Sequence, residues 1–313
     1  MRRHRRLKHR LQYFALAGSI AALRLVPFAL RVALCTAAAR VAQALVFEGR
    51  ARTNLRVAFG DTLSPEKRRE IRRANARSLG RFVAEIVDYD RSGPQTAARL
   101  VRLDESLAHL DEALALGRGV VCVTPHFGNW ELFPAHLTGR GYRGAVVGRA
   151  PANPWIAERL HGMRARCGVE TLEALGPPRA VLRVLQAGGV VGLLPDLDTK
   201  RVSGTFVNFF GKPAYTPTGP AALAIAAKAP IVTAYMIPEE RGYLLTFEKA
   251  ILPNPDAPRR EEIERLTAEW SRRFEDRIRA HPEHWVWVHD RWATTPEKLE
   301  ERRRRRMKAS AGA

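Results

Sequence analysis

The chain has 313 residues, 46% of them hydrophobic, and carries 52 Lys and Arg against 32 Asp and Glu, a formal net charge of +20. That length and hydrophobic content are ample for a sizeable core, in one large domain or in one domain with an appendage. The three cysteines, Cys35, Cys122 and Cys167, include no C-x-x-C pair. This pattern excludes a disulfide framework and a zinc finger, and it fits a reducing compartment.

The positive charge is concentrated at the two ends of the chain. Residues 1–10 carry six Lys or Arg and no acid, and residues 302–308 carry another six, so twelve of the twenty excess charges are terminal. Basic tails suit anionic phospholipid, nucleic acid or an acidic protein partner. A nucleic-acid-binding protein should also show basic residues interleaved with exposed aromatic residues, or a known fold signature. The sequence shows neither, so we expect an anionic membrane as partner and no nucleic acid.

The N-terminal segment predicts a membrane-associated helix. Residues 11–23 are uncharged, Arg24 interrupts the run, and apolar residues continue to Leu30. Residues 11–30 are therefore just long enough to span a bilayer, with the preceding arginines on the cytoplasmic side. The segment could instead be a helix that lies in the membrane interface, because Arg31 and Arg40 follow Arg24 closely. It could also be an amphipathic docking helix of a soluble protein, or a cleaved signal peptide, although no convincing cleavage site follows.

The rest of the chain predicts an α/β fold with a central, mostly parallel sheet flanked by helices. Ser64 and Pro65 are typical of a helix start, and that helix should run to about Asp88. A second helix is expected over 106–116. From there strands alternate with helices, which favours a sheet covered on both faces. Strands are expected over 119–125, 143–148, 189–195, 230–237 and 243–249, and helices over 154–166, 179–186, 217–228 and 260–280.

We therefore divide the chain into four parts. They are a basic N-terminus with an anchor helix (1–47), a helical connecting region (48–99), an α/β domain (100–295) and a basic C-terminal tail (296–313).

The most informative motif is His126-Phe127-Gly128-Asn129-Trp130-Glu131. His126 follows a predicted strand, at the end of the sheet where open α/β folds place their ligands. Glu131 lies one turn into the next predicted helix and could orient a histidine base. The alternative is a surface histidine beside a carboxylate that complements the helix dipole. The amides of Gly128 and Asn129 could stabilise an oxyanion, or Asn129 could simply cap the helix.

Further charged residues are candidates for substrate binding. Arg149 ends a predicted strand and suits a phosphate, or it is only a surface charge. Arg166 lies on an arginine-rich helix, a pattern also typical of a solvated face. Asp196 and Asp198 end a buried strand, where they could bind a sugar hydroxyl, pair with Arg149, or form a structural ion pair. No spacing typical of a metal site is present, so we expect no metal and no other cofactor.

Aromatic residues and one cysteine have two interpretations each. Phe206, Phe209 and Phe210 could line an apolar tunnel or belong to the core. Cys122 lies four strand residues before His126, about 13 Å away, which is too far for a nucleophile–base pair. Cys122 is therefore expected in the core. Three tryptophans could lie at the headgroup level of a membrane or pack the C-terminal segment, namely Trp285, Trp287 and Trp292.

Seven ordered blocks resemble one enzyme family over nearly the whole chain. The motif at 126–131 is similar to the HxxxxE signature of the bacterial lipid A biosynthesis late acyltransferases, which belong to the lysophospholipid acyltransferase-like superfamily. The N-terminal helix departs from the family's usual anchor, because it is less hydrophobic and richer in arginine. The other similar blocks are Asn54-Leu55, Val147-Gly148-Arg149 with Asn153-Pro154, Met163-Arg164-Ala165-Arg166, and the segments at 194–198, 205–211 and 282–292.

The resemblance implies transfer of a fatty acyl group from a thioester to a lipid hydroxyl. His126 would be the general base and Glu131 would hold its tautomer. No acyl-enzyme is needed, because a thioester is already activated. The acyl donor would be acyl carrier protein or acyl-CoA, and the acceptor a glycolipid such as a lipid A precursor. The phosphatidylinositol mannoside acyltransferases share the layout and transfer acyl chains from acyl-CoA to a glycolipid sugar.

Overall fold

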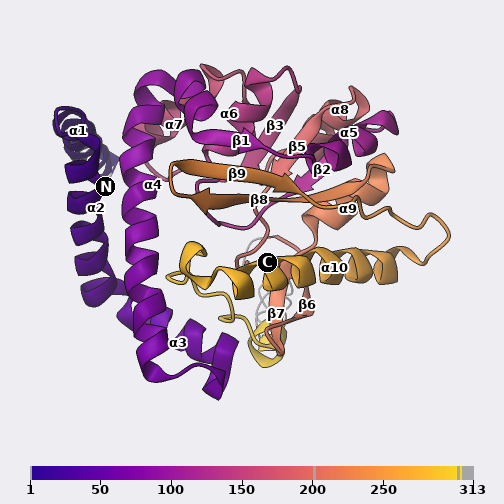
Figure 1. The fold of residues 1–313 in the computed structure, drawn as a ribbon. Helices are drawn as coiled ribbons and strands as arrows, with labels where there is room; N and C mark the ends of the chain where they lie inside the picture. Colours follow the sequence, from indigo (N-terminus) through magenta and orange to yellow (C-terminus); the bar gives the residue numbers. More distant parts are fainter. Residues whose placement is uncertain (1, 200–201, 302–303, 305–313) are drawn as a thin grey trace.

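The computed structural model describes residues 2–199, 202–301 and 304. Its main sheet has the strand order β1-β9-β8-β2-β5-β3-β4. Neighbouring strands are parallel except β8 and β9, which pair antiparallel (Figure 1). The strands are β1 (Val101–Leu103), β2 (Val120–Val123), β3 (Gly144–Gly148), β4 (Glu170–Glu173), β5 (Val190–Leu193), β8 (Ile231–Glu239) and β9 (Gly242–Phe247). The α/β fold class expected from the sequence is confirmed.

Helices cover both faces of this sheet, which explains why the central strands are short apolar runs. All four residues of β2 are buried, with no alternation of polar and apolar side chains, as expected for a strand packed on both sides. One face packs on α4 (Pro65–Leu100), α5 (Leu107–Ala115), α6 (Leu132–Gly139) and α7 (Pro154–Ala165). The other packs on α8 (Pro178–Gln186), α9 (Gly219–Ala227) and α10 (Arg259–Ala280).

Helix α4 begins as predicted and ends later than predicted. The Ser64 hydroxyl accepts a hydrogen bond from the Lys67 amide at 3.1 Å, and Pro65 is the first helical residue. The helix continues past Asp88 to Leu100 through a kink, where Ser92 has φ −136° and ψ 49°. Pro94 lies just after this kink, and its missing N–H and its ring account for the bend.

The N-terminal region is a set of helices rather than one continuous span. Helix α1 (Arg2–Arg24) ends before Pro27, and α2 (Phe28–Ala42) follows in a new direction, so the segment expected as one helix over 11–30 is broken. A π-helical turn then leads to α3 (Glu48–Phe59). Within the described residues, the helical run Phe28–Thr62 is long and apolar enough to cross a membrane, by length and composition. Helix α2 lies along α4 in Figure 1, and α1 contacts α4 and α7.

The segment 205–211, one of the blocks that resemble the family, forms most of the first strand and the turn of a β-hairpin. β6 (Gly204–Phe209) pairs antiparallel with β7 (Lys212–Pro217). Phe210 and Gly211 form the two-residue turn, with φ of 56° and 71°. Two residues with positive φ match the tight turns that suit the twist of a hairpin. The hairpin packs on α10.

The basic tail expected at 296–313 lies largely outside the described residues. Its described part begins with a short helical stretch from residue 296. The segment before this tail, residues 282–292, contributes to the site described next.

Candidate active site

His126 lies in a tight loop at the carboxyl end of β2. Gly128 has φ +62° in this loop, and a Cβ atom there would lie 2.0 Å from the carbonyl oxygen of Met236. Only glycine fits that close approach of two backbone segments. The Gly128 amide donates to the carbonyl of His284 at 3.2 Å, so it is already engaged and is not an oxyanion donor in this structure.

The His126 side chain is oriented by Asp196. Its Nδ1 lies 2.7 Å from Asp196 Oδ1, and its backbone amide donates to Oδ2 at 2.8 Å. Trp285 Nε1 also donates to Oδ2 at 2.8 Å. Strands β2 and β5 are parallel neighbours, and the residues that follow them therefore meet at one edge of the sheet. Asp196 is thus the acidic partner of the imidazole, where the sequence analysis expected Glu131.

Asp196 is held in its ionised form. Burial alone would raise its pKa, but the charge of His126 and the hydrogen bonds from the His126 ring, the Trp285 indole and the His126 amide together lower the pKa below its ordinary value. An ionised Asp196 accepts hydrogen bonds only, so the proton of a neutral imidazole resides on Nδ1. The other ring nitrogen, Nε2, then carries a lone pair and is available as a base.

Glu131 instead forms an ion pair with Arg164. Its two oxygens accept from Arg164 Nη2 at 2.6 Å and from Nε at 3.0 Å. Both side chains are only 12–13% exposed. The expected helix start is shifted, because α6 begins at Leu132 and Glu131 therefore precedes it. From that position the carboxylate reaches α7 and pairs with its arginine, while the His126 Nδ1 is already occupied by Asp196.

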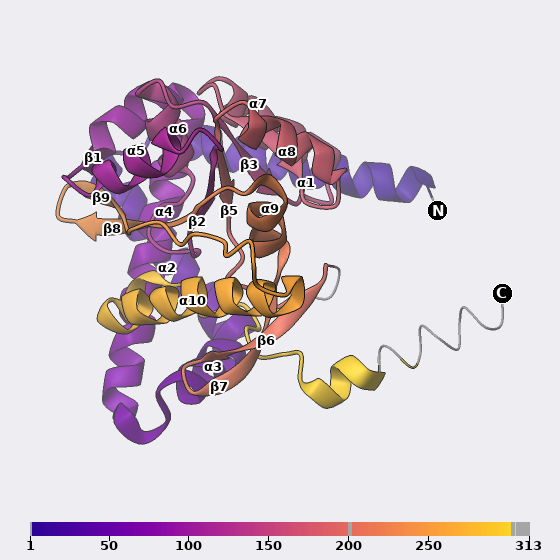
Figure 2. The same cartoon turned by 90° about the vertical axis from the view of Figure 1, so that its right-hand side faces the viewer.

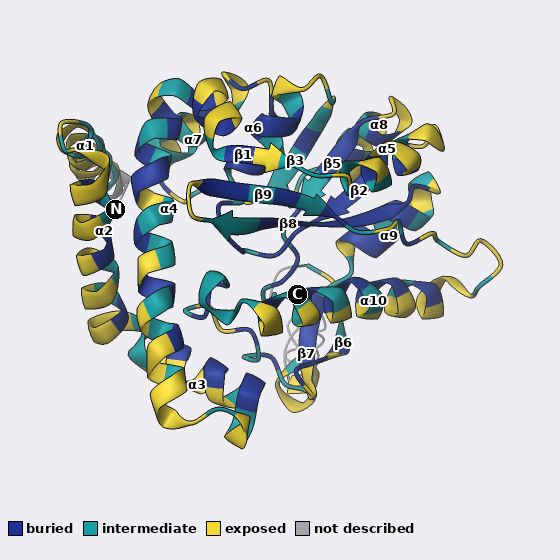
Figure 3. Cartoon of the chain, viewed as in Figure 1, coloured by how far each residue is buried: buried dark blue, intermediate teal, exposed yellow. Residues whose placement is uncertain are grey.

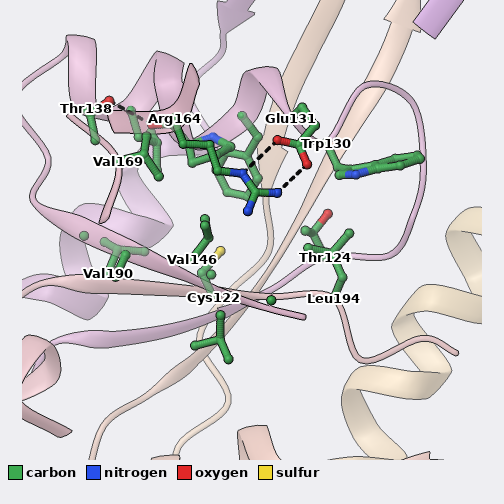
Figure 4. A pocket seen from close by; sticks show the side chains of 18 of the residues that line it. Cys122, Thr124, Trp130, Glu131, Thr138, Val146, Arg164, Val169, Val190 and Leu194 are labelled. Atoms are coloured by element: carbon green, nitrogen blue, oxygen red, sulfur yellow. Dashed lines mark hydrogen bonds and ion pairs between the residues drawn. The ribbon is translucent and has the colours of Figure 1, made fainter. Parts of the chain in front are cut away.

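A mostly apolar cavity of about 430 Å³ opens beside His126. It lies between α6 and the face formed by β2, β3 and β5, and it reaches from the carboxyl ends of these strands to the first residues of β3 and β5 (Figure 4). Figure 4 shows the Glu131–Arg164 pair on the cavity wall, beside Trp130. The volume falls within the range of small-molecule sites. The apolar lining includes Cys122, Phe133, Leu137, Val146, Val169, Val190 and Leu194.

Cys122 is fully buried in the core, as expected, and it also lines the cavity wall. Burial raises the pKa of its thiol to about 12, so the group is a neutral thiol at physiological pH. It has no hydrogen-bonded base, as expected from its distance along the strand from His126. Among the described residues, no group of three or more His, Cys, Asp or Glu is arranged to hold a metal ion.

Two of the predicted binding residues, Arg149 and Asn129, lie near His126 but differ in their surroundings. Arg149 is exposed and lines the same cavity, at the end of β3. Asn129 is fully buried and donates to Glu85 at 2.8 Å instead of facing the cavity. Glu85 also accepts from Tyr243 and Arg81, each at 2.7 Å. Asn129 therefore ties the His126 loop to α4 and does not line the cavity.

Asp198 and Arg166 do not reach the cavity. Asp198 accepts hydrogen bonds from the amide and the hydroxyl of Thr294, at 2.6 and 2.7 Å, and so holds the C-terminal segment. Arg166 caps α7 and points to Asp90 on α4, donating to the Asp90 carbonyl at 2.8 Å. Neither Asp196 nor Asp198 pairs with Arg149, the further expectation from the sequence. Asp196 is instead bonded to His126 and Trp285, and Asp198 is bonded to Thr294 of the C-terminal segment.

The aromatic residues at 206–210 and 285–292 are mainly structural. Phe209 and Phe210 belong to the core between the hairpin and α10, and Phe206 faces a different hollow beside α10. None of these three phenylalanines lines the cavity beside His126. Trp285 and Trp287 are fully buried, so they pack the C-terminal segment and do not face a membrane. Trp292 packs against the same core.

His289 is a site residue that the sequence analysis missed. Its ring centroid lies 6.3 Å from that of His126. Burial and the charge of His126 lower the pKa of His289, which favours a neutral ring. Asn54 of α3 fixes the backbone here by donating to the carbonyls of Trp287 and His289, at 2.8 and 2.5 Å. The only sequence signal was the position of His289 inside the C-terminal block.

Comparison with known proteins agrees with this geometry. The family model for bacterial lipid A biosynthesis acyltransferases matches residues 1–294. The chain belongs to this family. A phosphatidylinositol mannoside acyltransferase of Mycobacterium tuberculosis is 31% identical over 241 residues, which cover 75% of this chain and 73% of that protein. The lipid A biosynthesis lauroyltransferase of Escherichia coli K12 is 28% identical over 252 residues, 80% of each chain. The Escherichia coli K12 palmitoleoyltransferase of lipid A biosynthesis is 27% identical over 262 residues, 80% of this chain and 79% of that protein.

Proposed function

We propose that this protein transfers a fatty acyl chain from an acyl thioester to a hydroxyl group of a glycolipid. The observation that carries the proposal is the His126–Asp196 pair at the mouth of an apolar cavity. An imidazole held by a buried carboxylate is suited to remove a proton from a hydroxyl, and an apolar cavity is suited to hold an alkyl chain.

In the proposed reaction, Nε2 of His126 takes the proton of the acceptor hydroxyl as its oxygen attacks the thioester carbonyl. Asp196 stabilises the imidazolium that forms, as the carboxylate does in a catalytic triad. The C–S bond then breaks, and the imidazolium returns its proton to the leaving thiolate. The protein needs no covalent intermediate, because the thioester carbon is already electrophilic.

The cavity residues suggest how the donor is held. The acyl chain would lie along β2, β3 and β5, and Arg149 at the rim would bind a phosphate of the donor or of the acceptor lipid. The Glu131–Arg164 pair would close the wall between the polar mouth and the apolar interior. Acyl carrier protein is the first candidate donor, because the basic charge of this chain would attract an acidic partner.

A lipid A precursor is the first candidate acceptor, in line with the family. A phosphatidylinositol mannoside, acylated from acyl-CoA, is the second. We keep this second acceptor as a candidate because the chain is 31% identical to the mycobacterial enzyme and 28% identical to the lauroyltransferase.

We further propose that the protein works on the cytoplasmic face of the inner membrane, with α1 and α2 lying on the lipid surface. Most large apolar side chains that the described residues leave exposed lie between Leu7 and Val46. Figure 3 shows that α1 and α2 are exposed over much of their length. Arg31 of α2 is buried and bonded to Asp88, so this helix is fastened to α4. A helix fastened in this way favours attachment at the interface over crossing the bilayer.

The test is an acyl-transfer assay on membranes with both donors and both acceptors. We expect His126→Ala and Asp196→Asn each to lower turnover about 10²–10⁴-fold, because one loses the base and the other its tautomer control. Glu131→Gln is the matched control, since it changes a carboxylate that does not touch His126, and its loss should be clearly smaller. Unchanged turnover in a folded His126→Ala variant would refute the mechanism. A larger loss of turnover in Glu131→Gln than in Asp196→Asn would indicate that Glu131, not Asp196, orients His126.

A further inference from the structure

A second, polar cleft lies between α1, α4 and α7, outside the cavity described above. Its volume is about 490 Å³, and four arginines and two acids line it. Figure 2 shows α1 running past α7 at this side of the molecule. The lining consists of Tyr13, Arg24, Asp90, Arg91, Trp155, Glu158, Arg159, Gly162 and Arg166.

Three guanidinium groups converge on the single carboxylate of Asp90. Arg24 and Arg159 both contact Oδ2, at 2.7 and 2.5 Å, and Arg166 lies 3.6 Å from Oδ1. Asp90 itself is only 6% exposed at its side chain. One carboxylate cannot neutralise three guanidinium groups, so the cleft retains an excess of positive charge.

The guanidinium groups remain partly open to the cleft. The side chains of Arg24 and Arg159 are 33% and 26% exposed, and that of Arg166 is 54% exposed. The Nε atoms of Arg24 and Arg159 are buried and have no hydrogen-bond partner within the described part of the chain, so a bound anion would be contacted by the exposed guanidinium N–H groups instead. A guanidinium presents paired donors that match phosphate oxygens, so the cleft can accept an anion with several oxygens.

Its position indicates where that anion comes from. Arg24 ends α1, and the next residue, Leu25, is 88% exposed, while Phe28 at the start of α2 is 43% exposed. Tyr13 and Trp155 line the cleft, and amphipathic aromatic side chains are typical of the headgroup level of a membrane. The cleft thus adjoins the apolar surface of α1 and α2.

We propose that this cleft binds the phosphate of an anionic phospholipid headgroup, with Arg24 and Arg159 as its main donors and the lipid chains beside Leu25 and Phe28. The bound lipid would fasten α1 to α4 and α7 and so fix how the catalytic body sits on the membrane. This inference rests on the proposed membrane attachment but not on acyl transfer.

The experiment measures sedimentation of the full-length protein with vesicles of phosphatidylcholine, with and without a minority of phosphatidylglycerol. The readout is the ratio of the two partition coefficients at about 0.15 M salt, where distant charges are screened. Arg24→Gln and Arg159→Gln should each lower this ratio about tenfold, the value of one charge-assisted hydrogen bond. Each variant leaves two arginines on Asp90, so the fold should be retained.

Arg272→Gln is the matched control. Arg272 is an exposed arginine that pairs with acids on α10, away from α7 in both views (Figures 1 and 2). Its ratio should stay at the wild-type value. A loss in Arg272→Gln equal to that in Arg159→Gln would show that only net charge matters and would overturn the proposal.

Asp90→Asn gives a test of opposite sign. If the arginines serve an anion, removing the competing carboxylate should strengthen binding to phosphatidylglycerol vesicles and should raise the gain in thermal stability on adding them. If the arginines serve only Asp90, the variant should be less stable and gain nothing from the lipid.

Two further arms identify the source of the phosphate. Stabilisation of the protein by inorganic phosphate, equal to that by phosphatidylglycerol, would point to a soluble anion and overturn the lipid assignment. A higher KM for the acyl donor in Arg159→Gln, with an unchanged vesicle ratio, would assign the cleft to the donor instead. The vesicle readout needs no turnover, so failure of the proposed reaction would leave it interpretable.

Discussion

At the scale of single residues, three neighbouring strands contribute one row of residues to the cavity lining. Cys122 of β2 lies opposite Gly192 of β5, and Gly192 lies opposite Val146 of β3. All three line the cavity. Gly192 lacks a side chain, so it leaves room between its two neighbours. A Cβ atom at this position would lie 3.5 Å from Val146 Cγ1, an ordinary van der Waals contact.

Gly192 should therefore control which acyl chains fit. We expect Gly192→Leu to lower kcat/KM for long-chain donors by about 10–200-fold, because its side chain would occupy space that the distal methylenes need. Short-chain donors should be affected much less. Gly192→Ala is the control and should retain the wild-type preference. A competition assay with donors of graded length measures this. An unchanged preference in Gly192→Leu would show that the acyl chain does not pass this row.

At this scale, the sequence predicted the position of His126 but not its acidic partner. The position of His126 after a buried strand was predicted correctly, because a short apolar run before a glycine turn is a local signal. Its partner Asp196 lies 70 residues away and meets it only because β2 and β5 pair in parallel. Glu131 was nearer in sequence, but no local pattern could show that Arg164 would bind it.

At the scale of secondary-structure elements, the fastening of α2 to α4 depends on one buried arginine. Arg31 donates to Asp88 Oδ1 at 2.5 Å, and also to the carbonyls of Ala84 and Val26 at 3.3 and 3.1 Å. Its side chain is 7% exposed. The remaining contact between the two helices involves small residues, with Thr36 packed against Gly80 so closely that a Cβ there would clash at 2.4–2.6 Å. Arg31 thus provides polar interactions in an interface where small residues otherwise pack closely.

Removing Arg31 should loosen α2 without unfolding the sheet. We expect Arg31→Ala to lower the free energy of unfolding by about 2 kcal/mol, since it deletes charge-assisted hydrogen bonds of a buried group whose partner keeps some contact with water. Limited proteolysis around residues 25–27 should become faster. Arg99 is the other arginine near Asp88, and its side chain is 63% exposed. Arg99→Ala should therefore lower the free energy of unfolding by about 0.5 kcal/mol or less. Equal effects of the two changes would contradict this account.

Elements with strong periodic or apolar patterns were predicted from the sequence, while those defined by their neighbours were not. The predicted helix over 154–166 is confirmed as α7, and the predicted strand over 189–195 as β5. By contrast, β4 was missed because Glu170-Thr171-Leu172-Glu173 is an edge strand with two exposed acids. It is a strand because β3 offers it backbone hydrogen bonds.

At the scale of the whole molecule, the C-terminal segment joins parts of the chain that are far apart in sequence. Asn54 and Asn75 donate to its carbonyls from α3 and α4. Trp285 donates to Asp196 beside the His126 imidazole, and Arg291 donates to Tyr215 and Thr216 of the hairpin. Loosening this segment would therefore disturb the candidate active site, the hairpin and the N-terminal helices together.

His284 makes this segment sensitive to acid. Its Nδ1 lies 3.1 Å from the Ser78 hydroxyl of α4, and its carbonyl accepts from the Gly128 amide. Burial is the main cause that lowers the pKa of His284, from 6.5 to about 4, while Glu283 opposes the shift and His281 and Arg81 add to it. Below pH 6.5 the unfolded chain therefore binds a proton that the folded protein does not. Stability must rise with pH between about 4 and 6.5, and fall as the pH drops through that range.

The expected loss is about 3 kcal/mol of unfolding free energy between pH 7 and pH 4 from His284 alone, at about 1.36 kcal/mol for each unit of pKa shift. His136 and His289 have lowered pKa values as well and act in the same direction. Denaturant unfolding at a series of pH values measures the slope. His284→Gln should flatten the curve in this window, because glutamine can keep the Ser78 contact without taking up a proton. The same substitution at the more exposed His161 should leave the slope as it is. Parallel curves for wild type and His284→Gln would mean that the acid sensitivity of the fold arises elsewhere.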